Sequence, residues 1–281
     1  MAPDNTPSPQ INQAGRNNYW NTFSAVKDRG ELWYHLAGAD KAADSPGGTV
    51  APADLLYYVY RFSYERNVLR SAVETYCPRR DRALDCGTGT GRNAVLLAEY
   101  FERVSAFDIS RLFIGENRIR FARIRNLDFF ISDFSGLKTT PGAYDLIFVG
   151  GVCMYLSEAE MREALRLAAS ALRPDGVLVL RDSVTPAVTR EHEGKKIYRS
   201  EADYERIITG EGFAIRAKAN GAKRNLWCSL FRRLPAWSQE RRAVWRVFSF
   251  LTRLTSGGVN WAQPFRRHPL ANQLFYVCQP L

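Results

Sequence analysis

The middle of the chain alternates between two patterns of apolar residues. From Arg82 onward, short runs rich in β-branched and aromatic residues are separated by longer stretches in which apolar residues recur at helical spacing. The short runs predict seven strands, at 82–86, 104–108, 128–132, 144–149, 176–181, 213–219 and 272–278. Because strands and helices alternate, the pattern predicts an α/β fold with a mostly parallel seven-stranded sheet flanked by helices.

Two of the predicted helices begin with recognisable capping residues. Ser157 is followed three residues later by Glu160, which completes a capping box for a helix over 157–172. Ser200 and Asp203 mark the start of another helix. These residues predict where the two helices begin.

The N-terminal part of the chain has a different character. Residues 1–15 are rich in Pro, Asn, Ser and Gln and predict a disordered start. Residues 16–75 predict a helical cap, made of short helical pieces, a breaker-rich loop and a helix from Pro52 to about Thr75. Neither a signal peptide nor an apolar run of about 18 residues is found, so we expect a cytoplasmic protein that does not span a membrane.

Composition narrows the class further. With 281 residues, 46% of them hydrophobic, the chain suits a single α/β domain with additions. Its five cysteines are widely spaced and never form a C-x-x-C pair, which indicates neither a disulfide framework nor a zinc site. We expect no bound metal.

A glycine-rich loop follows the first predicted strand and opens a helix. The segment LDCGTGTGRN, residues 84–93, lets the backbone pass close to a ligand at a helix N-terminus. A dinucleotide fingerprint, G-x-G-x-x-G, requires its third glycine at position 92, which is Arg92; here the third glycine is Gly91. The spacing disfavours an NAD-binding loop.

This loop, preceded by Asp85, resembles motif I of class I methyltransferases that use S-adenosylmethionine (SAM). The resemblance implies a Rossmann-like core over 76–219 and an antiparallel last strand within 272–281. It also implies that Asp85 contacts the amino-acid end of SAM, usually through water. The loop residues expected to bind the cofactor are Gly87, Thr88, Gly89, Gly91 and Arg92.

Three later segments complete the expected cofactor site. Asp108, at the end of the second strand, can accept two hydrogen bonds from ribose hydroxyls, a feature shared with NAD enzymes, and Ile109 follows it. The resemblance places Asp133 at the adenine amino group and Phe134 beside the ring, and it brings Gly150 to Val152 near the sulfonium. Segment 171–182 resembles the helix, turn and fifth strand that follow in this family. We also include Tyr19 and Trp20, a pair similar to one in α-N-terminal protein methyltransferases.

Each of these features has a purely structural alternative. A glycine-rich turn can be only a tight connection, Asp108 only a helix cap and Asp133 only a turn residue. The order of the segments over the core favours the cofactor interpretation for the set as a whole.

The positive charge of the chain is concentrated near its end. From Lys223 onward there are ten Lys or Arg residues and one acidic residue, Glu240, a net of +9 within a total of +10. The resemblance makes 220–271 an insertion before the last strand, and it holds four of the six tryptophans. A predicted helix over 238–255 places Arg242, Arg246 and Arg253 on one side, and the residues of the other side are Val244, Val247, Phe248, Leu251 and Leu254. Such a helix suits a membrane surface or a polyanionic substrate, or it packs on the domain with its arginines in water.

Catalytic candidates follow the fourth and fifth strands, where the acceptor binds in this architecture. They are Tyr155 and, in a predicted loop over 185–200, His192 and Tyr198. His192 has a side chain suited to a general base, and its alternative is a solvated loop histidine beside Glu191 and Glu193.

The expected function is methyl transfer from SAM to an O or N nucleophile of a small-molecule, glycan or lipid-linked acceptor, with peripheral membrane contact through 220–271. Nucleic acid is not the expected partner. Three alternatives stay open: a protein N-terminal methyltransferase, a catalytically silent SAM-fold partner protein and an NAD-dependent oxidoreductase.

Overall fold

The computed structural model describes residues 52–137, 140–185, 189–192, 196–220, 226–239, 241–255 and 272–281. The predictions for residues 1–51, which include Tyr19 and Trp20, lie outside these ranges.

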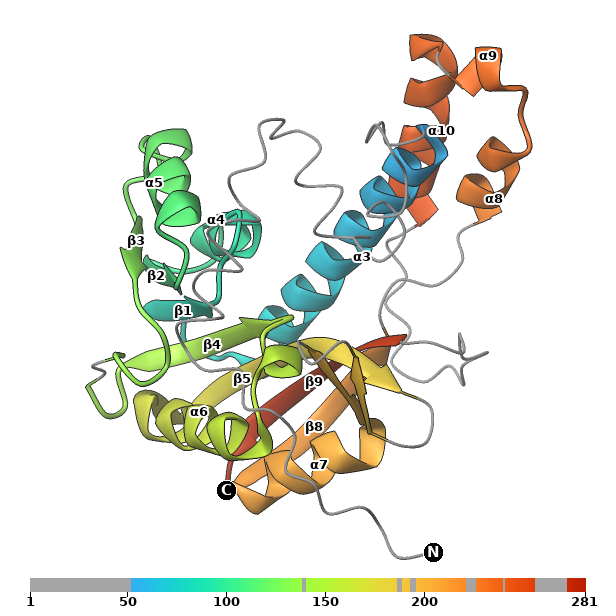
Figure 1. Cartoon of the computed structure of the whole chain (residues 1–281). Helices are drawn as coiled ribbons and strands as arrows, with labels where there is room; N and C mark the ends of the chain where they lie inside the picture. Colours follow the sequence, from blue (N-terminus) through green and yellow to red (C-terminus); the bar gives the residue numbers. More distant parts are fainter. Residues whose placement is uncertain are drawn as a thin grey trace, which may run out of the picture.

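The predicted α/β fold is confirmed (Figure 1). The central strands are β3 (Leu127–Ile131), β2 (Arg103–Asp108), β1 (Arg82–Cys86), β4 (Tyr144–Gly150) and β5 (Leu172–Thr185), paired in this order and all parallel. Next to β5 lies β9 (Asn272–Pro280), which is antiparallel to it and also pairs with β8 (Phe213–Asn220). The sheet therefore has the antiparallel last strand that the resemblance implied.

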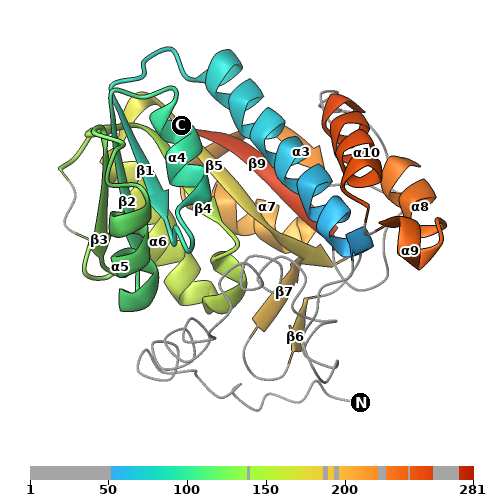
Figure 2. The ribbon, with the colours of Figure 1, turned by 90° about the horizontal axis from the view of Figure 1, so that it is seen from above.

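Helices cover both faces of the sheet and bury two apolar clusters. One face packs against α3 (Pro52–Tyr76) and α4 (Arg92–Ala98), and the other against α6 (Glu158–Ala171) and α7 (Glu201–Gly210). The helix α5 (Arg111–Arg120) lies beside β2 and β3, as Figure 2 shows. Both predicted caps form: Ser157 and Glu160 make the capping box of α6, and the Ser200 side chain caps α7. No helix in the described part of the chain is both long and apolar enough to cross a bilayer.

A hairpin replaces the loop predicted over 185–200. Its strands are β6 (Arg190–His192) and β7 (Lys196–Ser200). Val184 of β5 pairs with Arg199 of β7 on one edge and with Asn272 of β9 on the other, so β7 lies on the β4 side of β5, beyond the end of β4. The charged sequence of this segment has no apolar alternation, which is why the pattern did not predict strands.

In the described part of segment 220–271, the expected insertion, the chain forms the helices α8 (Leu226–Arg232), α9 (Ala236–Gln239) and α10 (Arg242–Thr255) (Figures 1 and 2). Both α8 and α10 contact α3. The helix predicted over 238–255 is confirmed from Arg242 to Thr255, but it begins four residues later than predicted. Ser238 lies in α9 and does not cap α10; its hydroxyl donates at 2.8 Å to the carbonyl of Pro235, which precedes α9.

One side of α10 faces α3 and α8. The Phe248 ring lies 5.2 Å from the Phe231 ring of α8, measured between centroids. Val247 and Leu254, which the helical wheel grouped with Phe248, are instead 56% and 66% exposed. The packed side of α10 is thus narrower than the sequence predicted.

We expect Phe248→Ala to lower the free energy of unfolding by about 2–3 kcal/mol, because it removes a ring from a packed contact. The matched variant Phe250→Ala changes a ring of the same helix that is 65% exposed, and it should cost less than about 0.5 kcal/mol. Urea unfolding of both proteins measures the difference. Equal losses would contradict the observed orientation of α10.

Candidate active site

The glycine-rich loop connects β1 to α4 and touches the segment that follows β4. Gly87 has a φ of 66°, and a Cβ atom placed on it would lie 2.4 Å from Cγ2 of Val152. Gly91, with a φ of 78°, approaches the Phe121 ring so closely that a Cβ would lie 2.8 Å from Cε2. Only glycine fits both positions. The structure thus brings the predicted cofactor segments around Gly87 and Val152 together.

Asp85 lies under this loop and is almost completely buried. Its Oδ2 accepts a hydrogen bond of 2.6 Å from the Thr88 hydroxyl. Burial raises the pKa of Asp85 to about 6, although the Thr88 hydrogen bond works in the opposite direction. A carboxyl group with such a pKa changes charge near physiological conditions, and a cation placed beside it would favour its ionised form.

Asp108 ties the end of β2 to the same loop. Its Oδ2 accepts from the Gly89 N–H at 2.8 Å and its Oδ1 from the Ser110 N–H at 2.9 Å. Asn117 of α5 donates to the Gly89 carbonyl at 2.7 Å and so holds the loop from the other side. Burial raises the pKa of Asp108, and these main-chain hydrogen bonds oppose the shift. Ile109, the next residue, is half-buried.

The segment after β3 makes the contacts of a turn. Oδ1 of Asp133 accepts from the Gly136 N–H at 2.7 Å and from the Ser135 hydroxyl at 2.9 Å. The ring of Phe134 stands edge-on to that of Phe107, with centroids 5.5 Å apart. Asp133 therefore stabilises a turn, which is the alternative role that the sequence analysis gave it. Its contact with adenine stays a prediction.

After β4 the chain turns at Gly150 and enters the short 3-10 helix η1 (Cys153–Tyr155). A Cβ on Gly150 would lie 2.5 Å from Cε1 of Phe148, so the turn has no space for a side chain. Tyr155 is half-buried at the end of η1. This helix lies where the predicted cofactor and acceptor regions meet.

Two buried charged residues hold η1 in place. Oδ2 of Asp182 accepts from the Met154 N–H at 3.0 Å. Arg199 of β7 donates to the carbonyls of Cys153, at 2.7 Å, and Leu156, at 2.5 Å. The hairpin strand that carries Tyr198 is thereby fixed to the segment that carries Tyr155.

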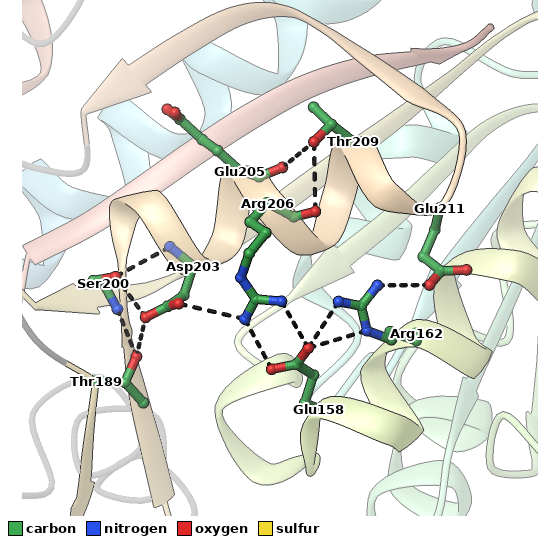
Figure 3. Close-up of polar contacts among 9 residues, drawn as sticks. All are labelled: Glu158, Arg162, Thr189, Ser200, Asp203, Glu205, Arg206, Thr209 and Glu211. Atoms are coloured by element: carbon green, nitrogen blue, oxygen red, sulfur yellow. Dashed lines mark hydrogen bonds and ion pairs between the residues drawn. The ribbon is translucent and has the colours of Figure 1, made fainter.

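The base of this hairpin is attached to α7 and α6 by the hydrogen-bonded residues of Figure 3. Asp203 accepts from the hydroxyl of Thr189, before β6, and at 2.6 Å from that of Ser200, the last residue of β7. Arg206 pairs with Asp203 and also with Glu158, the first residue of α6. Hydrogen bonds from Arg206 and Arg162 lower the pKa of Glu158 to about 2, so the Glu158 carboxylate stays charged at neutral pH. Both ends of the hairpin are thus anchored.

The predicted catalytic residues are only partly described. Tyr198 is half-buried on β7, whereas the position of the His192 side chain on β6 lies outside the described part. Among the described residues no group of His, Cys, Asp and Glu could hold a metal ion. All five cysteines are buried and outside any disulfide.

The sequence analysis missed a buried ionic cluster that joins α3 to this site. Glu65 of α3, only 4% exposed, accepts from Arg61 at 2.9 Å and from Arg181 of β5 at 3.0 Å, and it also pairs with Arg92 at the start of α4. The Arg92 guanidinium lies 3.7 Å from the centre of the Phe62 ring. We name Arg61, Glu65, Arg92 and Arg181 the arginine cluster.

The charges in the arginine cluster do not balance. Burial works to raise the pKa of Glu65, but the charges of Arg181, Arg61 and Arg92 outweigh it and hold this pKa well below its usual range. Three guanidinium groups therefore face one carboxylate. Among the described residues, Nη1 of Arg92 and Nε of Arg181 are buried without a hydrogen-bond partner. The cluster therefore contains two unused donors.

The cluster lies close to the predicted cofactor loop. Arg92 follows Gly91 directly, and the charge of Arg181 acts on the pKa of Asp85. The Arg181 guanidinium would lie 3.0 Å from a Cβ on Gly151. A charged residue inside the apolar strand sequence GVLVLRD was the available signal for Arg181. Nothing in the helical pattern of α3 indicated Glu65.

Comparison with known proteins gives one family match and several partial relatives. Residues 83–176 match the family model described as methyltransferase domain. Phosphoethanolamine N-methyltransferase 1 of Caenorhabditis elegans is 32% identical over 115 residues, which are 41% of this chain and 24% of that protein. N-terminal Xaa-Pro-Lys N-methyltransferase 1 of Homo sapiens is 29% identical over 142 residues, 48% of this chain and 63% of that protein. The matches therefore span less than two thirds of these relatives.

Solved structures share the fold. A SAM-dependent methyltransferase of Leishmania major superimposes over 99% of both chains with a TM-score of 0.56 and 19% identity. Phosphoethanolamine N-methyltransferase 1 of Haemonchus contortus, solved with phosphoethanolamine and S-adenosylhomocysteine, covers 96% of this chain and 50% of its own, with a TM-score of 0.56 and 20% identity.

We expect Glu65→Gln to lower the free energy of unfolding by about 3–5 kcal/mol, because it leaves buried guanidinium charges without their counter-ion. The control Glu99→Gln removes a carboxylate that pairs with Arg66 but is 45% exposed, and it should cost less than about 0.5 kcal/mol. Urea unfolding compares the two variants. A loss for Glu65→Gln no larger than that of the control would show that the cluster contributes nothing to the attachment of α3.

Proposed function

We propose that this chain, whose core is a class I, Rossmann-like SAM-dependent methyltransferase domain, transfers a methyl group from SAM to an O or N nucleophile of a small-molecule, glycan or lipid-linked acceptor. The observation that carries the proposal is the opposite charge of two neighbouring groups beside the glycine-rich loop. Asp85 provides a buried carboxyl group, and the arginine cluster provides unused donors.

These two groups fit the amino-acid end of SAM. An α-amino group is a cation and would favour the ionised form of Asp85. An α-carboxylate is an anion that suits Nη1 of Arg92 and Nε of Arg181, the donors without a partner. Asp108 can accept further hydrogen bonds from a ribose beyond those from Gly89 and Ser110, because a carboxylate has about four acceptor positions. Phe134 would contact the adenine ring.

The same features disfavour NAD. In a dinucleotide-binding loop the third glycine allows the helix to pack closely against the strand. Here that position is Arg92, whose side chain pairs with the buried Glu65 and stacks on Phe62. The position is occupied by a side chain with a structural role.

SAM would supply a methyl group activated by the positive sulfonium. The chain has to align the acceptor nucleophile with that group and to exclude water. We assign this task to Tyr155 and Tyr198, whose backbones are held together through Arg199. His192 stays a candidate general base.

The acceptor is proposed to be a small molecule, as in the relative named for phosphoethanolamine. A protein N-terminus is the second candidate, because the relative named for N-terminal Xaa-Pro-Lys matches a longer part of the chain. The anchored hairpin β6–β7 favours the first, since β7 pairs with the end of β5 beyond β4, on the side where an acceptor would bind.

We expect the affinity for SAM to fall as the pH drops below about 6. Asp85 has a pKa of about 6 in the free protein, and an ammonium group beside it should lower that pKa in the complex. Below pH 6 binding then requires the loss of a proton, and the dissociation constant should rise by up to about tenfold per pH unit. Calorimetry with S-adenosylhomocysteine, which carries the same amino group, measures the profile.

The control is Asp85→Asn, which should bind more weakly and show no such slope. It is needed because burial also raises the pKa of Asp182 to about 6, away from the proposed contact. A slope that persists in Asp85→Asn would assign the pH dependence to another group.

The function itself is tested with SAM that carries an isotopic label in its methyl group. We expect label in a product when the protein is incubated with cell extract, phosphoethanolamine or a peptide that begins with Xaa-Pro-Lys, as detected by mass spectrometry. Asp108→Ala should weaken SAM binding by roughly 1.5–3 kcal/mol. Tyr198→Phe should lower turnover and leave SAM affinity unchanged.

Each alternative gives a different result. SAM binding without any labelled product would indicate a catalytically silent partner protein. Binding of NAD in place of SAM would indicate an oxidoreductase. Labelling of the peptide alone would favour the second acceptor candidate.

A further inference from the structure

We propose that α10 and the adjoining α9 dock on the surface of an anionic lipid membrane. Figure 2 shows these helices with α8 on the far side of α3 from α4, away from the glycine-rich loop. The docking surface consists of the outward side of α10, with Arg246, Val247, Phe250, Arg253 and Leu254, together with Trp237 and Arg241 at the α9–α10 junction.

An apolar strip runs along the outward side of α10. Val247, Phe250 and Leu254 are 56%, 65% and 66% exposed. They are spaced by three and four residues, so their side chains share one side of the helix. Packing within the molecule does not account for them, because other residues of α10, such as Phe248, make the contacts with α3 and α8.

A basic strip borders the apolar one. Arg246 and Arg253 are both exposed and lie two helical turns apart, next to Phe250 on the helical wheel. Residues 226–255 contain six arginines and one acidic residue, Glu240. The region therefore has a net positive charge over an exposed apolar strip.

Trp237 extends the surface. Its side chain is 63% exposed, and the Arg241 guanidinium lies 4.9 Å from the centre of its ring. Tryptophan is enriched at the headgroup level of membranes, where one part of the indole is apolar and the N–H is hydrated. The pair thus combines an interfacial aromatic ring with a cation.

This combination favours a lipid surface over other occupants. A helix lying in the interface buries its apolar strip at the acyl boundary and presents arginines to lipid phosphates. A polyanion such as nucleic acid would use the arginines but leave three large apolar side chains in water. A second copy of the chain would bring two surfaces of the same positive charge together. Of these three occupants, only a lipid bilayer would contact the apolar strip and the basic strip favourably at the same time.

The test is co-sedimentation with vesicles of phosphatidylcholine alone and with phosphatidylserine added, at low and high salt. We expect binding to the anionic vesicles that salt weakens. Arg246→Gln with Arg253→Gln should reduce the partition coefficient about fivefold for each arginine removed, equivalent to about 1 kcal/mol per charge beside an anionic leaflet. Phe250→Ser with Leu254→Ser should reduce it about tenfold or more.

Matched controls change the same residue types elsewhere on the surface. Arg123→Gln with Arg125→Gln removes two exposed arginines, and Ile119→Ser removes an apolar side chain that is 83% exposed. Neither should alter vesicle binding. The far-ultraviolet circular dichroism and unfolding free energy of all variants should match the unaltered protein, because every changed side chain is exposed.

Three results would overturn the proposal. The first is equal sedimentation with neutral and anionic vesicles for every protein. The second is loss of binding in the controls to the same extent as in the α10 variants. The third is a change of oligomeric state in the Phe250/Leu254 variant, seen by size-exclusion chromatography, which would assign the strip to contact between copies of the chain.

Discussion

The arrangement around the proposed cofactor site depends on a single buried carboxylate. Glu65 accepts from arginines of α3 and β5 and pairs with the first residue of α4. Without it, the guanidinium groups of Arg92 and Arg181 would repel each other in a region with little water. The carboxylate therefore makes it possible for two arginines to lie beside the glycine-rich loop.

The arginine cluster also links regions that the sheet does not connect. Helix α3 contributes Glu65 on the side of the glycine-rich loop, and it packs against α10 and α8 of the insertion as well. The position of α3 is thus set by an ionic contact with the core and by apolar contacts with the insertion. Two kinds of interaction, one directional and one not, hold the same helix.

The sequence predicted those parts of the structure that depend on local patterns. The strands around Asp85 and Asp108 were predicted to within a residue or two, since their apolar runs are buried on both faces. The caps at Ser157 and Ser200 were predicted because a cap is a local hydrogen bond. The proximity of Gly87 to Val152 could be predicted from the order of the segments in the family. The ligand roles of both residues stay predictions.

Features that depend on distant contacts were not predicted. Glu65 and Arg181 are separated by 116 residues, and no spacing rule connects them. The strands β6 and β7 are held by Arg199, Thr189 and Asp203 more than by an apolar pattern, so the segment looked like a loop. The helical wheel of α10 could not show which part of its apolar side would meet α3. Periodicity predicts which side of a helix is apolar, but it does not predict how much of that side a neighbouring helix covers.

The pairing of β8 with β9 has a consequence for how this chain could have acquired its insertion. Asn220 and Leu274 are register partners, so the sheet fixes the two ends of the connection whatever its length. Lengthening such a closed connection adds only a slowly growing entropic cost, about 0.6 kcal/mol for each doubling. The sheet thus tolerates connections of very different length at this point, and helices can be added there without changing the pairing of a strand.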